Sequence, residues 1–300
     1  MPTQAAGELM TKSTLAPPEN YSLPRWAQQV LQYVEARQNP DGGYFFAQGA
    51  DSGAQDTYYA LDIFNLLRTG PPNLEATIDW LRKFPADNVY AYFYVGKGLA
   101  LHKRQVDQKI VQRLLELRKP HGGYSEIDVN IEAYSEFEAT YRATEVLREL
   151  HVPVDTEPTA QWLLNSMNTD GGFGRGCSNL ISTFHALSSL CNLGYQIREL
   201  KKTLQFVRSC EKKRGGFTVV SEVSLPFLQE VYAGATILRI MDEPFTYPKA
   251  TTELVLGLQN SNGGFRRSIE LGLSTFEDTY YALSTYESTR QPKANEIHVA

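Results

Sequence analysis

Two neighbouring carboxyl groups near the end of the chain, Glu277 and Asp278, are well suited to acid chemistry. The run Gln55-Asp56-Thr57 repeats their arrangement with an amide in place of the first acid. A positioned carboxyl group can hold a proton and pass it to a substrate, so Glu277, Asp278 and Asp56 are candidate catalytic residues. A structural interpretation stands beside this one: Glu277 closes a capping box with Ser274, and the charge of Asp278 suits the dipole at a helix start.

Aromatic and basic side chains form a second candidate set. The chain holds 17 tyrosines, many of them at helical spacing, and adjacent tyrosines are expected to point apart, so that about half reach a cavity. Five candidate substrate-binding residues occupy the same position in helices of different repeats. They are Tyr59, Tyr94, Arg142, His185 and Tyr281. Arginine makes forked contacts with oxyanions, so Arg142 suits a diphosphate, but it can equally pair with Glu138 one turn earlier. The tyrosine stripe can line a cavity or belong to the core.

The candidate residues lie within a sequence repeat, whose helices must position them. Gly-Gly-aromatic triplets begin at Gly42, Gly122, Gly171, Gly215 and Gly263, at intervals of 80, 49, 44 and 48 residues. The first interval is close to twice the others, which indicates a sixth copy that has lost its glycines. A period of this size is typical of an architecture in which no single unit can bury its apolar face alone.

Each repeat reads as two helices around the triplet. An amphipathic helix precedes the glycines, and a more apolar helix follows a polar stretch. Ser52, Ser135 and Ser274 each stand three residues before Gln or Glu, and these spacings predict capping boxes at three of the second helices. The glycine pair gives the turn its backbone freedom, and the aromatic residue is expected to plug between neighbouring hairpins. The chain is therefore predicted to be six helical hairpins at 22–288, with flexible tails at 1–21 and 289–300.

Composition limits the function classes. A net charge of −5 and a pI of about 5.6 argue against a nucleic-acid binder. No apolar run reaches the roughly 18 residues that span a bilayer, and no signal segment opens the chain, so we expect a cytoplasmic protein. Cys177, Cys191 and Cys210 show no disulfide or metal spacing. The acidic residues Asp128, Glu132, Glu136 and Glu138 leave Mg²⁺ binding open, or are simply solvated.

The repeats resemble those of protein prenyltransferase β subunits and squalene cyclases. The resemblance rests on segments such as Gln38-x-x-Asp-Gly-Gly-Tyr44 and Gln259-x-x-Asn-Gly-Gly-Phe265, each followed by a Tyr-Tyr-Ala-Leu-like helix, and it covers residues 22–288. It implies an all-α fold, an (α/α)6 toroid of six inner and six outer helices around a central cavity. In that family the cavity holds an isoprenoid chain.

The residues that carry out the chemistry in these enzymes are not found at the matching positions of this chain. Zinc-dependent prenyltransferases use an Asp-x-Cys pair and a His, where this chain offers Gln229, Val231 and Asp278, or in another register Ser182 and Phe184. Zinc is therefore not expected. The Asp-x-Asp-Asp motif of class II cyclases, which protonates an alkene, is absent from the sequence, and Glu277-Asp278 is the nearest approach. Arg175 stands one position from the family's phosphate-contact arginine and is a further candidate for substrate binding.

The resemblance implies a prenyltransferase-like or terpene-cyclase-like protein that handles a prenyl diphosphate or similar apolar substrate in an aromatic-lined cavity. The alternative is a toroid that binds an apolar ligand or a partner protein and catalyses nothing. Because β subunits of the family work beside a helical subunit, a helical partner suits both interpretations.

Overall fold

The computed structural model describes residues 23–126, 135–270 and 272–290. These residues form twelve α-helices and one two-stranded hairpin, and they divide into two compact units. The first unit contains described residues up to Glu116 together with Leu256–Ser284, and the second contains those from Leu117 to Val255 and from Thr285 onward. The predicted tails lie almost wholly outside the described residues, but the last helix continues to Arg290, past the predicted boundary at 288.

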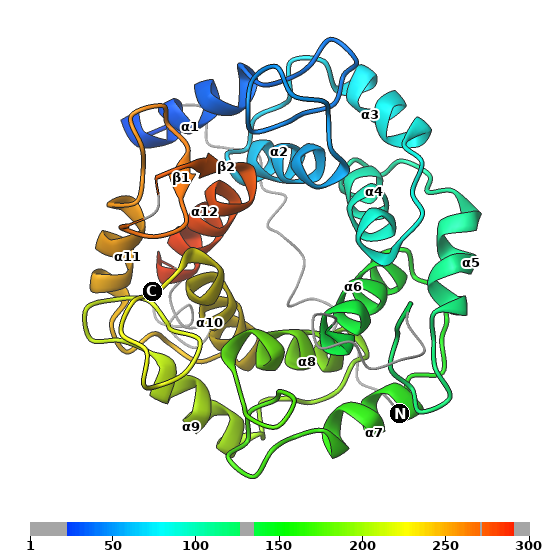
Figure 1. Ribbon diagram of the computed structural model, residues 1–300, viewed down its shortest axis with the longest axis vertical. Helices are drawn as coiled ribbons and strands as arrows, with labels where there is room; N and C mark the ends of the chain where they lie inside the picture. Colours follow the sequence, from blue (N-terminus) through cyan, green and yellow to red (C-terminus); the bar gives the residue numbers. More distant parts are fainter. Residues whose placement is uncertain (1–22, 127–134, 271, 291–300) are drawn as a thin grey trace, which may run out of the picture. The chain divides into compact units, whose positions relative to one another are not determined.

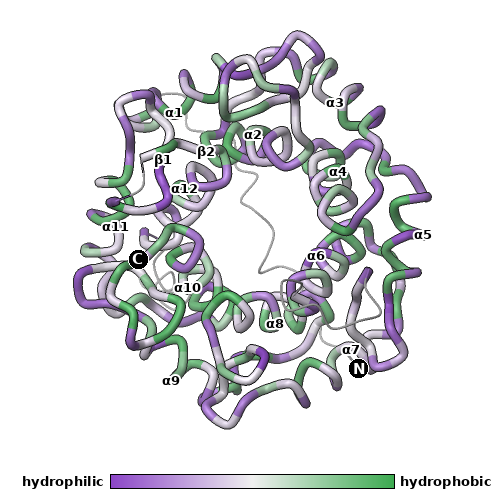
Figure 2. The backbone as a smooth tube through the Cα atoms, in the orientation of Figure 1, coloured by the Kyte–Doolittle hydropathy of each residue, from purple (hydrophilic) through white to green (hydrophobic). Residues whose placement is uncertain are grey.

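The first unit holds the first two hairpins, the outer helix of the third, and the turn and start of the second helix of the last. Its elements are α1 (Arg25–Glu35), α2 (Ala54–Leu66), α3 (Leu74–Lys83), α4 (Val89–Leu101), α5 (Gln108–Glu116), β1 (Phe265–Arg266), β2 (Ser274–Thr275) and the start of α12 (Phe276–Arg290). Helices α2 and α4 pack against each other, and α3 and α5 pack on α4 (Figure 1). Figure 2 shows hydrophilic and hydrophobic residues mixed along α3 and α5, as expected of helices with one buried face.

The second unit repeats this arrangement. Its helices are α6 (Glu136–Glu149), α7 (Glu157–Asn165), α8 (Leu180–Asn192), α9 (Lys201–Cys210), α10 (Leu228–Met241) and α11 (Pro248–Leu256). Helix α8 lies between α6 and α10 and packs against both, while α7 contacts α8 and α9 contacts α10. The second helix of each pair is more completely buried than the first, as the hydropathy pattern predicts.

The glycine turns join the repeats by close backbone approach. Gly42 has φ of +95°, and a Cβ there would lie 2.5 Å from the carbonyl oxygen of Ala76 on α3. Only glycine fits such a contact without displacing the neighbouring helix. The aromatic residue after each pair is 0–1% exposed, which confirms that it acts as a plug. These residues are Tyr44, Tyr124, Phe173, Phe217 and Phe265.

The first and last repeats are in contact, as predicted for a closed array. Within the first unit, the Tyr33 hydroxyl donates to the Ser274 carbonyl at 3.0 Å, and the Gln259 side chain donates to the Trp26 carbonyl at 2.8 Å. A Cβ on Gly263 would lie 2.1 Å from the backbone oxygen of Gln29. The turn of the last repeat thus packs on α1 as the turn of the first repeat packs on α3.

One of the three predicted capping boxes has its serine cap, and two were wrong. Ser135 Oγ accepts the Glu138 amide at 3.3 Å and caps α6. Ser52 instead donates to Asp41 at 2.8 Å, and α2 starts after Gly53 without a side-chain cap. Ser274 donates to Asn262 at 2.9 Å, while Thr275 accepts the Asp278 amide. Both serines precede the helix start and hold the acidic or amide residue of the glycine turn.

Candidate functional site

The three candidate acids lie at the starts of two helices in the first unit. Asp56 is in the first turn of α2, and Glu277 and Asp278 are in the first turn of α12. Asp56 and Asp278 are only 9% and 8% exposed. The Asp278 carboxylate accepts a hydrogen bond from the Thr275 hydroxyl at 2.8 Å. Two carboxyl groups that are both buried and close to a third acid are an unusual electrostatic arrangement, since buried acids are rare unless paired.

Burial shifts the titration of both aspartates. It raises the pKa of Asp56 from 3.8 to about 7, with repulsion from Glu277 adding to the rise and the Phe46 backbone hydrogen bond opposing it. Burial likewise raises the pKa of Asp278 to about 6, opposed by the Thr275 hydrogen bond and by Arg267 and reinforced by Glu277. A substantial fraction of these carboxyl groups is therefore protonated near neutral pH. Groups in that state are able to act as general acids.

Glu277 does not close a capping box, so that structural interpretation was wrong. Its Oε1 accepts hydrogen bonds from the Tyr281 hydroxyl at 2.9 Å and the Tyr59 hydroxyl at 3.1 Å. The two hydroxyl oxygens are 3.4 Å apart. The reason is geometric: Thr275 occupies the cap and leaves the Glu277 side chain to face the neighbouring tyrosines. Two residues predicted to bind substrate, Tyr59 and Tyr281, are thereby joined to a predicted catalytic residue.

Aromatic rings from three helices surround this contact. Tyr59 lies with its ring centroid 5.7 Å from that of Tyr94, 5.2 Å from that of Tyr280 and 6.1 Å from that of Tyr281. Tyr58 contacts the same group, 5.2 Å from Tyr59. The expectation that adjacent tyrosines diverge was wrong here, because rings from α4 and α12 reach both members of the pair on α2. We call Tyr58, Tyr59, Tyr94, Tyr280 and Tyr281 the tyrosine cluster.

The basic candidates fall in the second unit. Arg142 Nη2 and Nε both donate to Glu138 Oε1, at 2.7 and 3.2 Å, so the intrahelical ion pair is the arrangement observed. The His185 ring stacks on Tyr141 at 5.4 Å with an interplanar angle of 17°. Burial lowers the pKa of His185 to about 4, opposed by Glu138 and reinforced by Arg142. At neutral pH His185 is therefore uncharged and contributes no cation to an anionic ligand.

Arg175 is not brought to the other basic candidates. It is exposed in the loop between α7 and α8, and it has no hydrogen bond or ion pair with any described residue. Sequence analysis also missed two residues near the acids. Burial raises the pKa of the Tyr33 hydroxyl, opposed by Arg37 and reinforced by Asp56 and Asp278, so this group lies within electrostatic reach of both acids. Thr275 was passed over in favour of Ser274, and nothing in the spacing separates the two.

The residues at the positions that the resemblance assigns to zinc do not make a ligand set. Of these only Asp278 offers a carboxylate, and it is hydrogen-bonded to Thr275. Across 23–126, 135–270 and 272–290, no group of three or more His, Cys, Asp or Glu side chains is placed to hold a metal ion. Of the acids considered for Mg²⁺, Asp128 and Glu132 lie outside the described residues, whereas Glu136 contacts the His121 ring at 2.6 Å and Glu138 accepts from Arg142 at 2.7 Å. No chemical step is therefore assigned to a metal.

No helix in the described ranges combines the length and apolarity of a membrane span.

Comparison with known proteins identifies the fold. Candida albicans protein geranylgeranyltransferase-I, complexed with GGPP, is similar with a TM-score of 0.65 and 17% identity over 89% of this chain and 87% of that one. A variant of the type II terpene cyclase MstE from Scytonema, in complex with geranylgeranyl dihydroxybenzoate, has a TM-score of 0.55 and 14% identity over 88% and 95% of the two chains. A protein from Actinoplanes has a TM-score of 0.59 and 15% identity over 89% and 99%. No curated protein sequence matches.

At these identities the structural matches establish the fold, which confirms the predicted all-α toroid class. The family follows from the sequence itself. Residues 19–85, 88–179 and 176–298 each match the model of the Prenyltransferase alpha-alpha toroid domain, which accounts for nearly the whole chain. The chain therefore belongs to the prenyltransferase α/α toroid family.

Proposed function

We propose that the protein binds an isoprenoid and that Asp56 and Asp278 protonate it to start a cyclisation or isomerisation. The observation that carries the proposal is the pair of buried carboxyl groups in the first turns of α2 and α12, the two helices that supply four of the five tyrosines of the cluster. A protonated carboxyl group and aromatic faces are the two elements that carbocation chemistry on an alkene requires. Structural neighbours that are complexed with GGPP or with a geranylgeranyl compound support an isoprenoid as the substrate class.

The proposed reaction is balanced without a redox partner. One carboxyl group gives its proton to an alkene carbon, and the π electrons form the new C–H bond. The resulting carbocation is stabilised by neighbouring tyrosine rings and by the negative charge of Glu277. Loss of a proton from an adjacent carbon to the same carboxylate restores the acid, so the product is an isomer of the substrate.

The roles of individual residues differ. Asp56 and Asp278 are the proposed proton donors, because their pKa values lie near neutral pH. Glu277 is a positioning residue that holds the hydroxyl groups of Tyr59 and Tyr281. Arg142 becomes available to a diphosphate only after it parts from Glu138, and His185 is neutral. This favours an uncharged polyene over a prenyl diphosphate as the substrate.

The test is product formation from isoprenoids of different length, with and without a diphosphate group. Purified protein is incubated with each compound, and extracts are analysed by mass spectrometry for isomeric products. Whichever of Asp56→Asn and Asp278→Asn removes the donor should lower turnover by about 10²- to 10⁴-fold, the usual contribution of a general acid, and the double variant should show the same loss. Asp51→Asn is the matched control, because Asp51 is exposed in the loop before α2. Turnover that survives in both variants, or an absence of products from every isoprenoid, would reject the proposal.

A non-catalytic binding module is the second candidate, and one observation favours it. Every member of the tyrosine cluster is 9% exposed or less, and the cluster is held closed by its own ring contacts and by Glu277. Such a protein would bind an isoprenoid or a partner without changing it. Saturable isoprenoid binding that is unaffected by Asp56→Asn, with no product, would support this alternative. A helical partner subunit remains a prediction under both functions.

A further inference from the structure

The connection between α3 and α4 is where the repeat breaks. Helix α1 is separated from α2 by residues 36–53, which include the first glycine turn, whereas α3 is separated from α4 only by residues 84–88. The second repeat therefore has no glycine turn to lay on the following outer helix, α5. The other five glycine turns show which contacts an outer helix normally makes with the turn that packs on it.

In the intact repeats the outer helix presents a fixed set of residues to the preceding turn. One position lies under the first glycine, as Ala76 lies under Gly42. The next position is a threonine in four repeats, and Thr77 and Thr159 donate to the glycine carbonyl at 2.8 and 2.7 Å. Four residues after the first position stands a large apolar residue, which covers the second glycine in most repeats. These apolar residues are Tyr33, Trp80, Trp162, Phe206 and Leu254.

Helix α5 departs from this set at the last position, where the other outer helices have a large apolar residue. Its buried residues, Ile110, Val111 and Leu114, match Thr77, Ile78 and Leu81 of α3, so Ile110 replaces the threonine. The same register places Lys109 under the missing first glycine and Arg113 where the large apolar residue stands. Two of these residue types also occur under intact turns, since α9 has Lys202 at the first position and α1 has Val30 at the second, so Arg113 is the residue that sets α5 apart. Lys109 and Arg113 are exposed.

The missing turn coincides with a groove of about 860 Å³. Its lining includes an apolar trough formed by Leu81, Phe84, Val95 and Ile110, and it also includes the charged residues Arg82, Asp107, Lys109 and Arg113. Arg82 and Arg113 have exposed acid neighbours on their own helices, Asp79 and Glu116, while Lys109 has no ion pair with a described residue. The side chains that line the groove thus carry three positive charges and one negative charge above an apolar trough, but Asp79 and Glu116 pair with two of the cations, at 3.5 and 2.7 Å, and leave Lys109 as the cation without an ion pair among the described residues.

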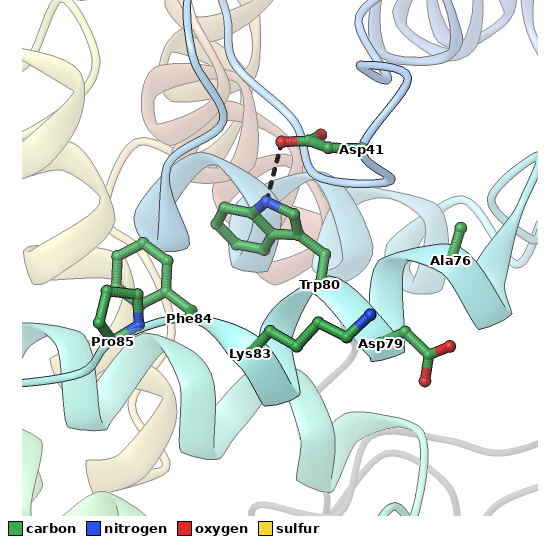
Figure 3. A pocket seen from close by; sticks show the side chains of 7 residues that line it. All are labelled: Asp41, Ala76, Asp79, Trp80, Lys83, Phe84 and Pro85. Atoms are coloured by element: carbon green, nitrogen blue, oxygen red, sulfur yellow. Dashed lines mark hydrogen bonds between the residues drawn. The ribbon is translucent and has the colours of Figure 1, made fainter.

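The first repeat shows how a turn would fill such a groove. Asp41, just before Gly42, accepts a hydrogen bond from the Trp80 indole at 2.9 Å (Figure 3). The same Asp41 carboxylate accepts the Gly43 amide at 3.0 Å and so fixes the turn. Because Arg113 replaces Trp80 on α5, an aspartate arriving in the same way would meet a guanidinium group. Such a contact is a charge-assisted pair and is stronger than the indole hydrogen bond.

We infer that this groove is a docking site for a peptide segment of a partner protein in which an acidic residue precedes two small residues and an aromatic side chain. The aromatic ring enters the apolar trough, and the acid pairs with Lys109 and with Arg113, whose ion pair with Glu116 it replaces. The site lies on the outer helices α3 and α5 with α4, and it involves none of the residues of the acid site. The groove would thus recognise the same residue types that form the chain's own glycine turns, but in a segment that belongs to another molecule.

The test uses a fluorescent peptide with the sequence of residues 38–46, Gln-Asn-Pro-Asp-Gly-Gly-Tyr-Phe-Phe, titrated with the full chain and followed by anisotropy. We expect saturable binding that Arg113→Glu weakens by about tenfold, the usual effect of losing one charged interfacial contact. Lys249→Glu on α11 is the matched control, since its side chain is 91% exposed and far from α5 in sequence. A peptide with lysine in place of its aspartate should bind Arg113→Glu better than wild type, which tests the pair itself.

Two results would overturn the inference. The first is an absence of saturable binding up to the solubility limit of the peptide, or binding that Arg113→Glu and Lys109→Glu leave unchanged. The second is a concentration-dependent dimer, measured by sedimentation, that Arg113→Glu abolishes, because it would assign the groove to a second copy of the chain. Both substitutions are on the exposed side of α5, so folding of the variants can be verified by circular dichroism.

Discussion

Asp56→Asn should stabilise the protein at alkaline pH. The pKa of Asp56 rises from 3.8 to about 7 on folding, so between these values the folded state binds more protons than the unfolded state. The free energy of unfolding contributed by this group is therefore largest at low pH and falls as pH rises through about 7. At about 1.4 kcal/mol per pKa unit, the full rise corresponds to roughly 4 kcal/mol.

Asparagine has nearly the shape of aspartate, and its side-chain oxygen can still accept the Phe46 amide. The variant should unfold with a free energy about 2–4 kcal/mol above that of wild type at pH 8, and close to wild type at pH 4. Urea denaturation followed by circular dichroism at several pH values gives both numbers. The difference between variant and wild type isolates Asp56 from the other acids, and Asp51→Asn serves as the exposed control. A difference that is independent of pH, or that grows toward acid, would refute the burial of an ionisable Asp56.

Three further predictions concern the turns, His185 and metal content. Gly42→Ala should lower the free energy of unfolding by about 2 kcal/mol or more, because its Cβ would lie 2.5 Å from the Ala76 oxygen, whereas Gly49→Ala, with φ of +83° and nothing within 4 Å, should cost about 1 kcal/mol. The His185 ring should remain neutral down to about pH 5 in NMR titrations, so its contribution to stability is present above an unfolded pKa of about 6.5 and is lost as pH falls through about 4; a charged ring at pH 6 would contradict its burial. Purified protein should contain no stoichiometric zinc by elemental analysis, and one tightly bound zinc per chain would require a ligand set not assembled among the described residues.

The repeat and its turns could be predicted because one residue type satisfies them. Gly42 must adopt positive φ and approach a backbone oxygen, and no other residue can do both, so the glycine pairs mark the hairpins in the sequence itself. The sixth copy was recovered from spacing alone. The effect of the lost turn on α5 could not be predicted from the sequence. The roles of Ile110 and Arg113 become clear only when the structure shows which residues of the other outer helices face a turn.

The candidate site was predicted less well, for a different physical reason. Ser274 and Thr275 can both cap α12, and the choice depends on where Asn262 of the turn places its oxygen. Once Thr275 takes the cap, Glu277 is free to bind Tyr59, which is 218 residues away in sequence. Arg142 offers the same lesson, since a local partner at i−4 and a remote diphosphate are equally consistent with its position. Sequence identifies the groups, but only packing identifies their partners.

The most direct test of the central proposal is proton transfer from the protein to an isoprenoid. Reactions are run in D₂O with the isoprenoid that gives a product, and deuterium in that product is located by mass spectrometry. The proposal predicts one deuterium per product molecule at a carbon of the original double bond, and its loss together with turnover in Asp56→Asn or Asp278→Asn. Product formed without solvent deuterium, or labelled equally by the double variant Asp56→Asn/Asp278→Asn, would contradict the assignment of the buried carboxyl groups as the acid.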